Sequence, residues 1–394
     1  MTASPQLTAQ TLLEALRPDQ TADNWLAHLA ARQVAWDDLV VWAVAVGLAP
    51  QLAARLQGWQ ANAPPRATAK LSVIAKAQAQ RSAAIFEQLA QVLAACVANG
   101  VRPIALKGVH LAALVYAEPG LRPMNDIDLL FEPSEMERVA GLLGALGYAG
   151  KYKSAEIGPG VMKHTSTFKR EDSADTTPNP YLSAGNARMI EPHTSLEESW
   201  FGLKVDITPG VRDRAESAQL AGQPCRVLAR EDLLLHLCVH FCFHLIQGAP
   251  ALVQFGDLLA VTQAGEIAWP LFVARAGERR AAPYALAALT LAREWLGAPV
   301  SAETLAELER LTPSRLAQRI HRLSLADILR RTQQKPITTL GERLRRGLSD
   351  RAETARWAPD WRGRWQVWRT ALQPARSDTG RLLLGRSLKT RDHA

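Results

Sequence analysis

The sequence predicts an α+β fold in which a small mixed sheet lies between two helical regions. Apolar residues recur at steps of three and four through most of residues 1–95, which is the spacing of amphipathic helices. From there to Arg214, short apolar runs alternate with turn residues, which is typical of a sheet-containing core, and helical spacing returns afterwards. We therefore divide the chain into an N-terminal helical region (1–95), a core (96–214), a C-terminal helical region (215–335) and a basic Arg/Trp-rich tail (336–394).

The N-terminal region is predicted to hold shorter helices followed by one long helix. Helical spacing covers residues 22–32 and 36–56, and the Ala-Pro-Pro-Arg segment at 63–66 interrupts it. An Ala/Gln-rich helix then runs from Thr68 to Asn99. Gly100, directly after it, suits the left-handed conformation that ends a helix.

The core is predicted to alternate between strands and helices. Ser134 and Glu137 fit a capping box at the start of its second helix, which ends at Gly147. The polar segment 172–186 is interpreted as a long hairpin loop. The predicted strands are 101–106, 126–131, 165–169 and 189–194, and the predicted helices are 109–116 and 132–147.

Composition argues against several classes of protein. An apolar content of 47% can supply a buried core, and the four cysteines do not suggest a disulfide framework. The N-terminus lacks a basic segment followed by an apolar one, so we expect no signal peptide. No apolar stretch is long enough and apolar enough to span a bilayer. We therefore expect a cytoplasmic protein without a membrane span.

The net charge of +8 is concentrated at the C-terminal end of the chain. Residues 341–394 contain 13 Lys/Arg and 6 Asp/Glu, a difference of +7. Such a tail could bind nucleic acid, an anionic surface or an acidic partner, and its tryptophans could stack on bases. The favoured interpretation is that the tryptophans pack against the body while the arginines stay in water. These tryptophans are Trp357, Trp361, Trp365 and Trp368.

An acidic pair lies in the second predicted strand of the core. Residues two apart on a strand point to the same face, so Asp126 and Asp128 project together while Ile127 faces the core. Two carboxylates this close repel each other unless a cation lies between them. Carboxylate oxygens, water and substrate phosphates suit Mg²⁺, with Mn²⁺ as the alternative. Such ions hold the attacking and leaving oxygens of a phosphoryl displacement, so we predict that this pair binds metal.

Residues near the acidic pair suit the binding of a phosphate chain. Gly108 follows Lys107 where a strand leads into a helix, so the backbone can approach a phosphate at the helix N-terminus. Lys107 adds a point charge, and Arg122 can form paired hydrogen bonds to phosphate oxygens. A structural salt bridge is the alternative role for Arg122.

A third carboxylate is expected on a neighbouring strand. Glu191 is the best candidate, and His193 faces the same side two residues later. We expect His193 to support the site or pack beside it rather than to act as a general base. Pro192 cannot donate to a strand ladder, so Glu191 is expected at an edge or a bulge. Asp206 is the alternative third carboxylate.

Three segments in this order resemble the uncharacterised bacterial nucleotidyltransferase family of the DNA polymerase β superfamily. They are Leu106-Lys-Gly, the Arg-x-x-x-Asp-Ile-Asp pattern that begins at Arg122, and Glu191-Pro-His. The segment 231–240 also resembles the helix that follows the core in that family. The likeness covers about residues 25–260.

This resemblance implies a polymerase β-like core that transfers a nucleotidyl group from an NTP, with ATP as the expected donor. It also implies that Asp126, Asp128 and Glu191 hold the metal. The wider superfamily has Gly-Ser or Gly-Gly at the first motif, whereas this chain has Gly108-Val109. A degenerate core that binds nucleotide or a partner without catalysis is therefore an alternative. The acceptor is left open.

Two further features bear on function. A nucleic-acid-binding protein that acts through the basic tail is a third hypothesis, although it is not favoured. His236, His240 and His244 recur every four residues, a spacing that can bind zinc on one helix face. Because the neighbouring residues are apolar, we interpret them as core histidines.

Overall fold

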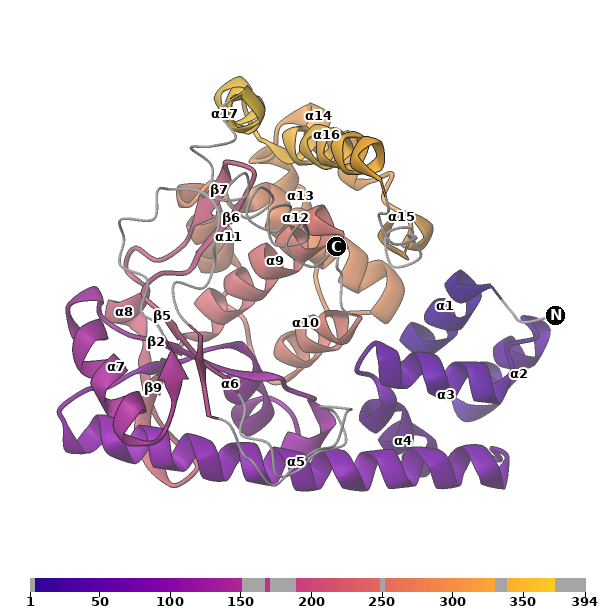
Figure 1. Cartoon of the computed structure of the whole chain (residues 1–394). Coiled ribbons are helices and arrows are strands. Elements are labelled where there is room, and N and C mark those ends of the chain that lie inside the picture. Colours follow the sequence, from indigo (N-terminus) through magenta and orange to yellow (C-terminus); the bar gives the residue numbers. More distant parts are fainter. Residues whose placement is uncertain (1–3, 151–166, 171–188, 249–251, 330–338, 373–394) are drawn as a thin grey trace.

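The protein combines a sheet-containing core with two groups of helices, which confirms the α+β class (Figure 1). The computed structural model describes residues 4–150, 167–170, 189–248, 252–329 and 339–372. The hairpin loop predicted at 172–186 lies outside the described residues. The N-terminal helices lie to one side of the sheet, and the last two helices lie at the far end of the C-terminal group.

Helices fill the N-terminal region, as predicted. The pattern at 36–56 forms two helices, because the chain turns at Gly47, which has φ +76°. The long helix begins with Pro65 and is followed by Gly100, which has φ +71°. It extends from the sheet to the N-terminal helices (Figure 1). These helices are α1 (Pro5–Leu16), α2 (Ala22–Ala31), α3 (Trp36–Ala45), α4 (Ala49–Gly58) and α5 (Pro65–Ala98).

The strands of the described residues form two sheets. They are β1 (Ile104–Ala105), β2 (Asp126–Leu130), β3 (Ala149–Gly150), β4 (Phe168–Lys169), β5 (Met189–His193), β6 (Glu197–Trp200), β7 (Leu203–Asp206), β8 (Glu216–Leu220) and β9 (Gln223–Val227). A mixed sheet has the order β3-β4-β5-β2-β1-β9-β8, and β6 and β7 form a separate antiparallel pair. β2 lies between β5, which is parallel to it, and β1, which is antiparallel.

The mixed sheet extends past the predicted end of the core, and the prediction of helix directly after Arg214 is wrong. After the short helix α8 (Val211–Arg214), β8 and β9 form a hairpin, and β9 pairs with β1. Ala221 and Gly222 form its turn with φ values of +51° and +72°. Alanine is uncommon in that conformation, so the sequence lacks the Asn-Gly or Asp-Gly signal of such a turn.

The helix after β2 begins differently from the prediction. Ser134 lies inside a 3-10 turn, η2 (Pro133–Glu135), and the capping box joins Glu132 to Glu135. Because proline fixes the helical φ value, Pro133 starts the turn, and the N-cap is Glu132, two residues before the expected Ser134. The remaining helical elements of the core are α6 (Lys107–Leu114), η1 (Pro119–Leu121) and α7 (Met136–Ala145).

The two faces of the mixed sheet pack against different layers. Ile127 and Leu129 of β2 are buried in an apolar cluster with α5 and α7. Asp126, Asp128 and Leu130 alternate with them and therefore point to the opposite face. Leu130 belongs to the larger apolar cluster that includes helices of both helical regions. The acidic pair thus lies on the sheet face turned away from α5.

The C-terminal region is helical, and part of the predicted tail is packed into it. Trp357 is 1% exposed and Val367 is fully buried. The prediction that the four tail tryptophans all pack against the body is wrong, because Trp361, Trp365 and Trp368 are exposed. No helix of the described ranges is long and apolar enough to cross a membrane. The helices are α9 (Arg230–Gln247), α10 (Val253–Gln263), α11 (Trp269–Glu278), α12 (Ala282–Leu296), α13 (Ala302–Arg310), α14 (Ser314–Ile320), α15 (Leu325–Leu329), α16 (Leu340–Trp357) and α17 (Trp361–Leu372).

Candidate functional site

The acidic pair lies on an interior strand of the mixed sheet. Asp128 is 3% exposed, and Asp126 at the start of β2 is partly exposed. The backbone N–H of Leu106 donates to the Asp128 carbonyl at 3.1 Å, which holds the start of α6 beside the pair. On the other side, the buried Arg81 of α5 donates to the Met124 carbonyl at 3.0 Å and so fixes the segment that leads into β2.

Glu191 and His193 extend the acidic pair into a cluster. The parallel register places Glu191 opposite Asp128 on β5, and both point to the same face. One side-chain ligand atom from each of Asp128, Glu191 and His193 lies within 4.8 Å of the other two. His193 Nε2 lies 2.7 Å from Asp128 Oδ1. Glu191 and His193 are 7% and 5% exposed, so the cluster is largely shielded from water.

The two aspartates differ in their electrostatic surroundings. Burial, and after it the charge of Asp128, raises the pKa of Asp126 to about 7. Burial also opposes ionisation of Asp128, but Lys107 and His193 hold the pKa of Asp128 well below its usual range. A further positive charge stabilises the ionised forms of carboxylates that share a buried site in this way. The oxygen-rich donor set is the one that Mg²⁺ or Mn²⁺ prefers.

Lys107 lies against the acidic pair. Its ammonium Nζ is 2.9 Å from Asp128 Oδ1, and the residue is 7% exposed. Burial opposes the positive charge, but the carboxylates of Asp128, Asp126 and Glu198 together raise the pKa of Lys107. Lys107 has φ +37°, a backbone conformation that costs a non-glycine residue about 1–3 kcal/mol. This strained residue at the first position of α6 directs its charge into the cluster.

Gly108 packs closely against the segment that precedes β2. A Cβ at this position would lie 3.0 Å from Met124 Cγ and 3.2 Å from Arg122 Nη1. These side chains would have to shift by a few tenths of an ångström to admit a larger residue. This packing is a structural reason for the glycine, beside the contact with phosphate that the sequence suggested.

Arg122 points to a carboxylate outside the acidic cluster. Its Nε and Nη2 atoms donate to the two oxygens of Asp257 on α10, at 3.1 and 2.8 Å. Tyr116 donates to the same carboxylate at 2.9 Å, and Asp257 is 1% exposed. Burial opposes the guanidinium charge, but Asp257 raises the pKa of Arg122. The structural salt bridge, which was the alternative role for Arg122, is thus present.

Asp206 lies apart from the acidic cluster. It ends β7 in the two-stranded sheet, where it is opposite Glu197, and it accepts a hydrogen bond from Thr208 N at 2.9 Å. Glu191, which is opposite Asp128 in the mixed sheet, is therefore the better placed of the two candidate acids.

Within the described residues, Pro192 does not interrupt the hydrogen bonding of β5 to its neighbouring strands. β5 pairs with β4 only at Ile190, opposite Phe168, within those residues. On its other side, the carbonyl of His193 accepts from Phe131 N at 2.8 Å. Because neighbouring residues point their polar groups to opposite sides of a strand, the missing N–H of Pro192 lies on the β4 side. This arrangement explains how a proline fits beside Glu191.

Three residues around the site were not found from the sequence. Arg81 stands in an Ala/Gln-rich stretch without a neighbouring motif, and Asp257 is 135 residues away from its partner Arg122. Glu198 of β6 is 4% exposed, and its charge acts on Lys107. A buried charged residue needs a partner, and this need is the only signal that could have singled out these three residues. It could not be used, because burial is not visible in a sequence.

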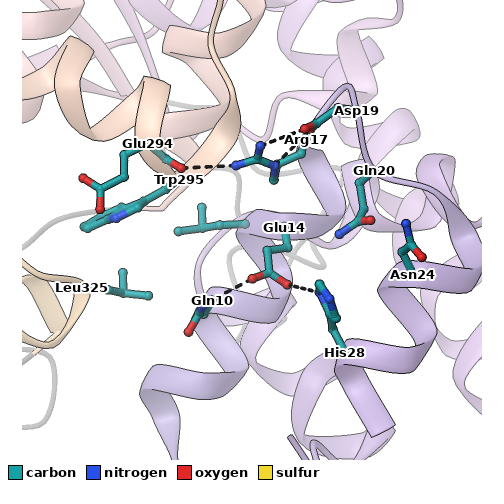
Figure 2. Close-up of a pocket in the computed structure, with 11 residues that line it drawn as sticks. Gln10, Glu14, Arg17, Asp19, Gln20, Asn24, His28, Glu294, Trp295 and Leu325 are labelled. Atoms are coloured by element: carbon teal, nitrogen blue, oxygen red, sulfur yellow. Dashed lines mark hydrogen bonds and ion pairs between the residues drawn. The ribbon is translucent and has the colours of Figure 1, made fainter. Parts of the chain in front are cut away.

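A cavity of about 580 Å³ lies elsewhere, between the N-terminal helices and α12 and α15 (Figure 2). Its polar groups largely pair with one another: Glu14 accepts from Arg32 at 2.6 Å and lies 3.1 Å from His28 Nδ1. Arg17 donates to Asp19 and to the Glu294 carbonyl. None of the predicted site residues lines this cavity. The ion pairs lie within the N-terminal helices, and the hydrogen bond from Arg17 to the Glu294 carbonyl connects them to α12.

Comparison with known proteins identifies a family for the chain. No curated protein and no solved structure matches the chain. One family model matches residues 32–297, which include Lys107, Asp126, Asp128 and Glu191. Because this match spans more than half of the chain, it shows that the protein belongs to the family described as an uncharacterised nucleotidyltransferase.

Proposed function

We propose that this protein is a divalent-metal-dependent nucleotidyltransferase that uses an NTP, with ATP as the expected donor. An acceptor hydroxyl attacks the α-phosphorus, the bond to the bridging oxygen of the β-phosphate breaks, and pyrophosphate leaves. The nucleoside monophosphate is then attached to the acceptor oxygen. The proton of the hydroxyl passes to Glu191.

One observation carries this proposal: Asp128 and Glu191 lie opposite each other on parallel strands, with Asp126 on the same face. Membership of the nucleotidyltransferase family supports the same reaction class. We infer that these three carboxylates hold Mg²⁺, because their oxygens form the donor set that this ion prefers. A bound divalent ion supplies charge neutralisation at the phosphate oxygens.

The other residues of the site have separate roles in this proposal. His193 holds the Asp128 carboxylate in one orientation through its hydrogen bond of 2.7 Å. Lys107, whose ammonium lies 2.9 Å from Asp128 Oδ1, would reach the phosphate chain if a bound ion balanced the charge of that carboxylate. Arg122 and Asp257 together keep the segment before β2 in place, and Gly108 allows α6 to pack closely on it.

The proposal is tested by incubating the purified protein with each α-labelled NTP and Mg²⁺, together with bacterial small-molecule, RNA and protein extracts. We expect label to move to an acceptor, and Asp126→Asn combined with Asp128→Asn to abolish the transfer. Asp206→Asn is the matched control, because Asp206 is an acid at a strand end outside the cluster. Transfer by the double variant at the wild-type rate would contradict the proposal. Binding of NTP without any transfer would instead support the degenerate, non-catalytic core.

A second candidate function rests on α17. Trp361, Trp365 and Trp368 are 67%, 56% and 38% exposed, and they share one helix face because they are four and three residues apart. Arg362 and Arg364 are exposed beside them. Exposed aromatic rings between cations are suited to stacking on the bases of single-stranded nucleic acid. We therefore propose nucleic-acid binding through α17 as the alternative function, or as the way in which an RNA acceptor is held.

This alternative is tested with surface variants instead of a truncation, because α16 carries the buried Trp357. We expect the triple change of Trp361, Trp365 and Trp368 to Ala to weaken binding of labelled single-stranded RNA, in a manner that depends on salt. Substitution of the exposed Leu348 on α16 by Ala serves as the control for loss of an exposed apolar side chain. Equal RNA binding by the wild-type protein and the triple variant would contradict this function.

A further inference from the structure

A second group of metal-ligating side chains lies between β6 and α9. His236 and His240 are on α9, and Glu198 is on β6, which packs against that helix. Glu198 is 38 positions from His236 and 42 from His240 in the sequence, so only the fold brings the carboxylate to the histidines. His236 and Glu198 are 5% and 4% exposed.

The geometry of this group is close to that of a chelating site. His240 Nδ1 lies 3.0 Å from Glu198 Oε1, and the His236 and His240 rings are 6.0 Å apart. One ligand atom from each of the three residues lies within 4.8 Å of the other two. Ligands of a tetrahedral zinc ion lie about 3.4 Å apart, given bonds of about 2.0–2.1 Å. Side-chain rotations that move the ligand atoms by about 1 Å would therefore bring them to the spacing of zinc ligands.

The donor atoms distinguish this group from the acidic cluster on the sheet. The acidic cluster offers three carboxylates, from Asp126, Asp128 and Glu191, beside the single imidazole of His193, and this oxygen-rich set suits hard ions such as Mg²⁺. The group on α9 offers two imidazole nitrogens and one carboxylate, a donor set that suits Zn²⁺. Histidines four residues apart on a helix lie on the same face, so both can reach one ion.

We propose that Glu198, His236 and His240 form a zinc site that is separate from the acidic cluster. The two sites can hold different ions. The bound ion would join the β6–β7 sheet to α9, and thus the strands after the acidic cluster to the C-terminal helices. It would also offset the charge of Glu198 near Lys107, so the occupancy of the zinc site and the charge balance of the acidic cluster are linked. The site itself does not depend on the proposed nucleotidyl transfer.

The experiment measures zinc binding directly. The full-length protein is stripped with a chelator and titrated with Zn²⁺ in the presence of a chromophoric competitor, and Co²⁺ is added in parallel because its visible spectrum reports the ligands. We expect about one Zn²⁺ per chain and a Co²⁺ spectrum typical of tetrahedral nitrogen and oxygen ligands. His236→Gln and Glu198→Gln should each weaken Zn²⁺ binding by at least about a hundredfold, since loss of an outer-shell partner alone costs about 10- to 100-fold.

Two control variants make the assignment specific. His244→Gln changes the next histidine of the same helix, whose ring is 4.4 Å from that of His240 but which is not part of the group, and should keep Zn²⁺ binding. Asp128→Asn alters the acidic cluster and should also keep it. Zn²⁺ binding that is lost in Asp128→Asn and kept in His236→Gln would overturn the proposal, as would a wild-type protein that gives no Co²⁺ spectrum. Neither of these outcomes depends on whether nucleotide is transferred.

Discussion

Lys107 and Arg122 both precede the same acidic strand in the sequence, yet the fold uses them differently. Lys107 places its ammonium 2.9 Å from Asp128, inside the acidic cluster. Arg122 forms a two-pronged ion pair with Asp257 of α10, in the helical region. One cation therefore belongs to the candidate catalytic site, and the other connects the core to the helices around it.

This difference shows what nearness in sequence can and cannot predict. Both cations precede β2 in the sequence, Arg122 by four residues and Lys107 by nineteen. The direction of each side chain is set by the nearest buried carboxylate, and for Arg122 that carboxylate comes from a helix 135 residues later. A buried charge must be paired, so the partner that arrives by tertiary packing determines the role.

The largest effect should come from breaking the Arg122–Asp257 pair. Because Arg122 and Asp257 side chains are 13% and 1% exposed, Arg122→Ala leaves a buried carboxylate with the Tyr116 hydrogen bond but without its cation, and should lower the free energy of unfolding by about 3–5 kcal/mol. Arg17→Ala, which removes an ion pair to the exposed Asp19, should cost less than about 1 kcal/mol through that pair. Urea unfolding measures both. An Arg122→Ala protein of wild-type stability that has lost NTP binding would show that Arg122 binds phosphate.

A smaller effect, on binding rather than on folding, is expected at Lys107. Lys107→Met removes a charged hydrogen-bond donor worth about 1.5–3 kcal/mol, so the affinity for Mg²⁺–NTP should fall about 10- to 100-fold. Affinity for free Mn²⁺ should not fall, because the ammonium no longer competes with the ion for Asp128. Calorimetric titrations with the nucleotide and with the ion separate the two effects. Unchanged nucleotide affinity would remove Lys107 from the phosphate site.

The smallest effect tests how α6 packs beside these cations. Gly108→Ala places a methyl group 3.0 Å from Met124 Cγ, so it should destabilise the protein by about 1–3 kcal/mol. Gly141→Ala on α7 meets nothing within 4 Å and should instead stabilise it by about 0.5–1 kcal/mol. Thermal melts of the two variants should therefore shift in opposite directions. Equal shifts would indicate that Gly108 is not held by packing.

Much of the fold could be predicted because strands and helices have different apolar spacings. The alternation of Asp126, Ile127 and Asp128 identified a strand with one acidic face, and the structure has that strand as β2. The spacing from Thr68 to Asn99 likewise identified α5, which begins three residues earlier, at Pro65, and ends at Ala98. These features are local, so sequence alone contains them.

The parts that could not be predicted depend on contacts between distant residues. The β8–β9 hairpin was missed because its turn, Ala221-Gly222, has an atypical first residue. Glu198 carries no motif, and its meeting with His236 and His240 arises only when β6 packs on α9. The prediction that the tryptophans of α17 pack against the body was wrong for a related reason. Helical spacing shows which residues share a face, but not whether that face is covered.

The central claim is that Asp126, Asp128 and Glu191 hold the metal that accompanies the nucleotide. Electron paramagnetic resonance of Mn²⁺ in the presence of a non-hydrolysable ATP analogue tests it most directly, because bound Mn²⁺ loses the signal of the free ion. We predict that the wild-type protein and Asp206→Asn bind Mn²⁺ with the analogue, whereas Asp128→Asn and Glu191→Gln do not. Equal Mn²⁺ binding by all four proteins would contradict the account and place the metal elsewhere.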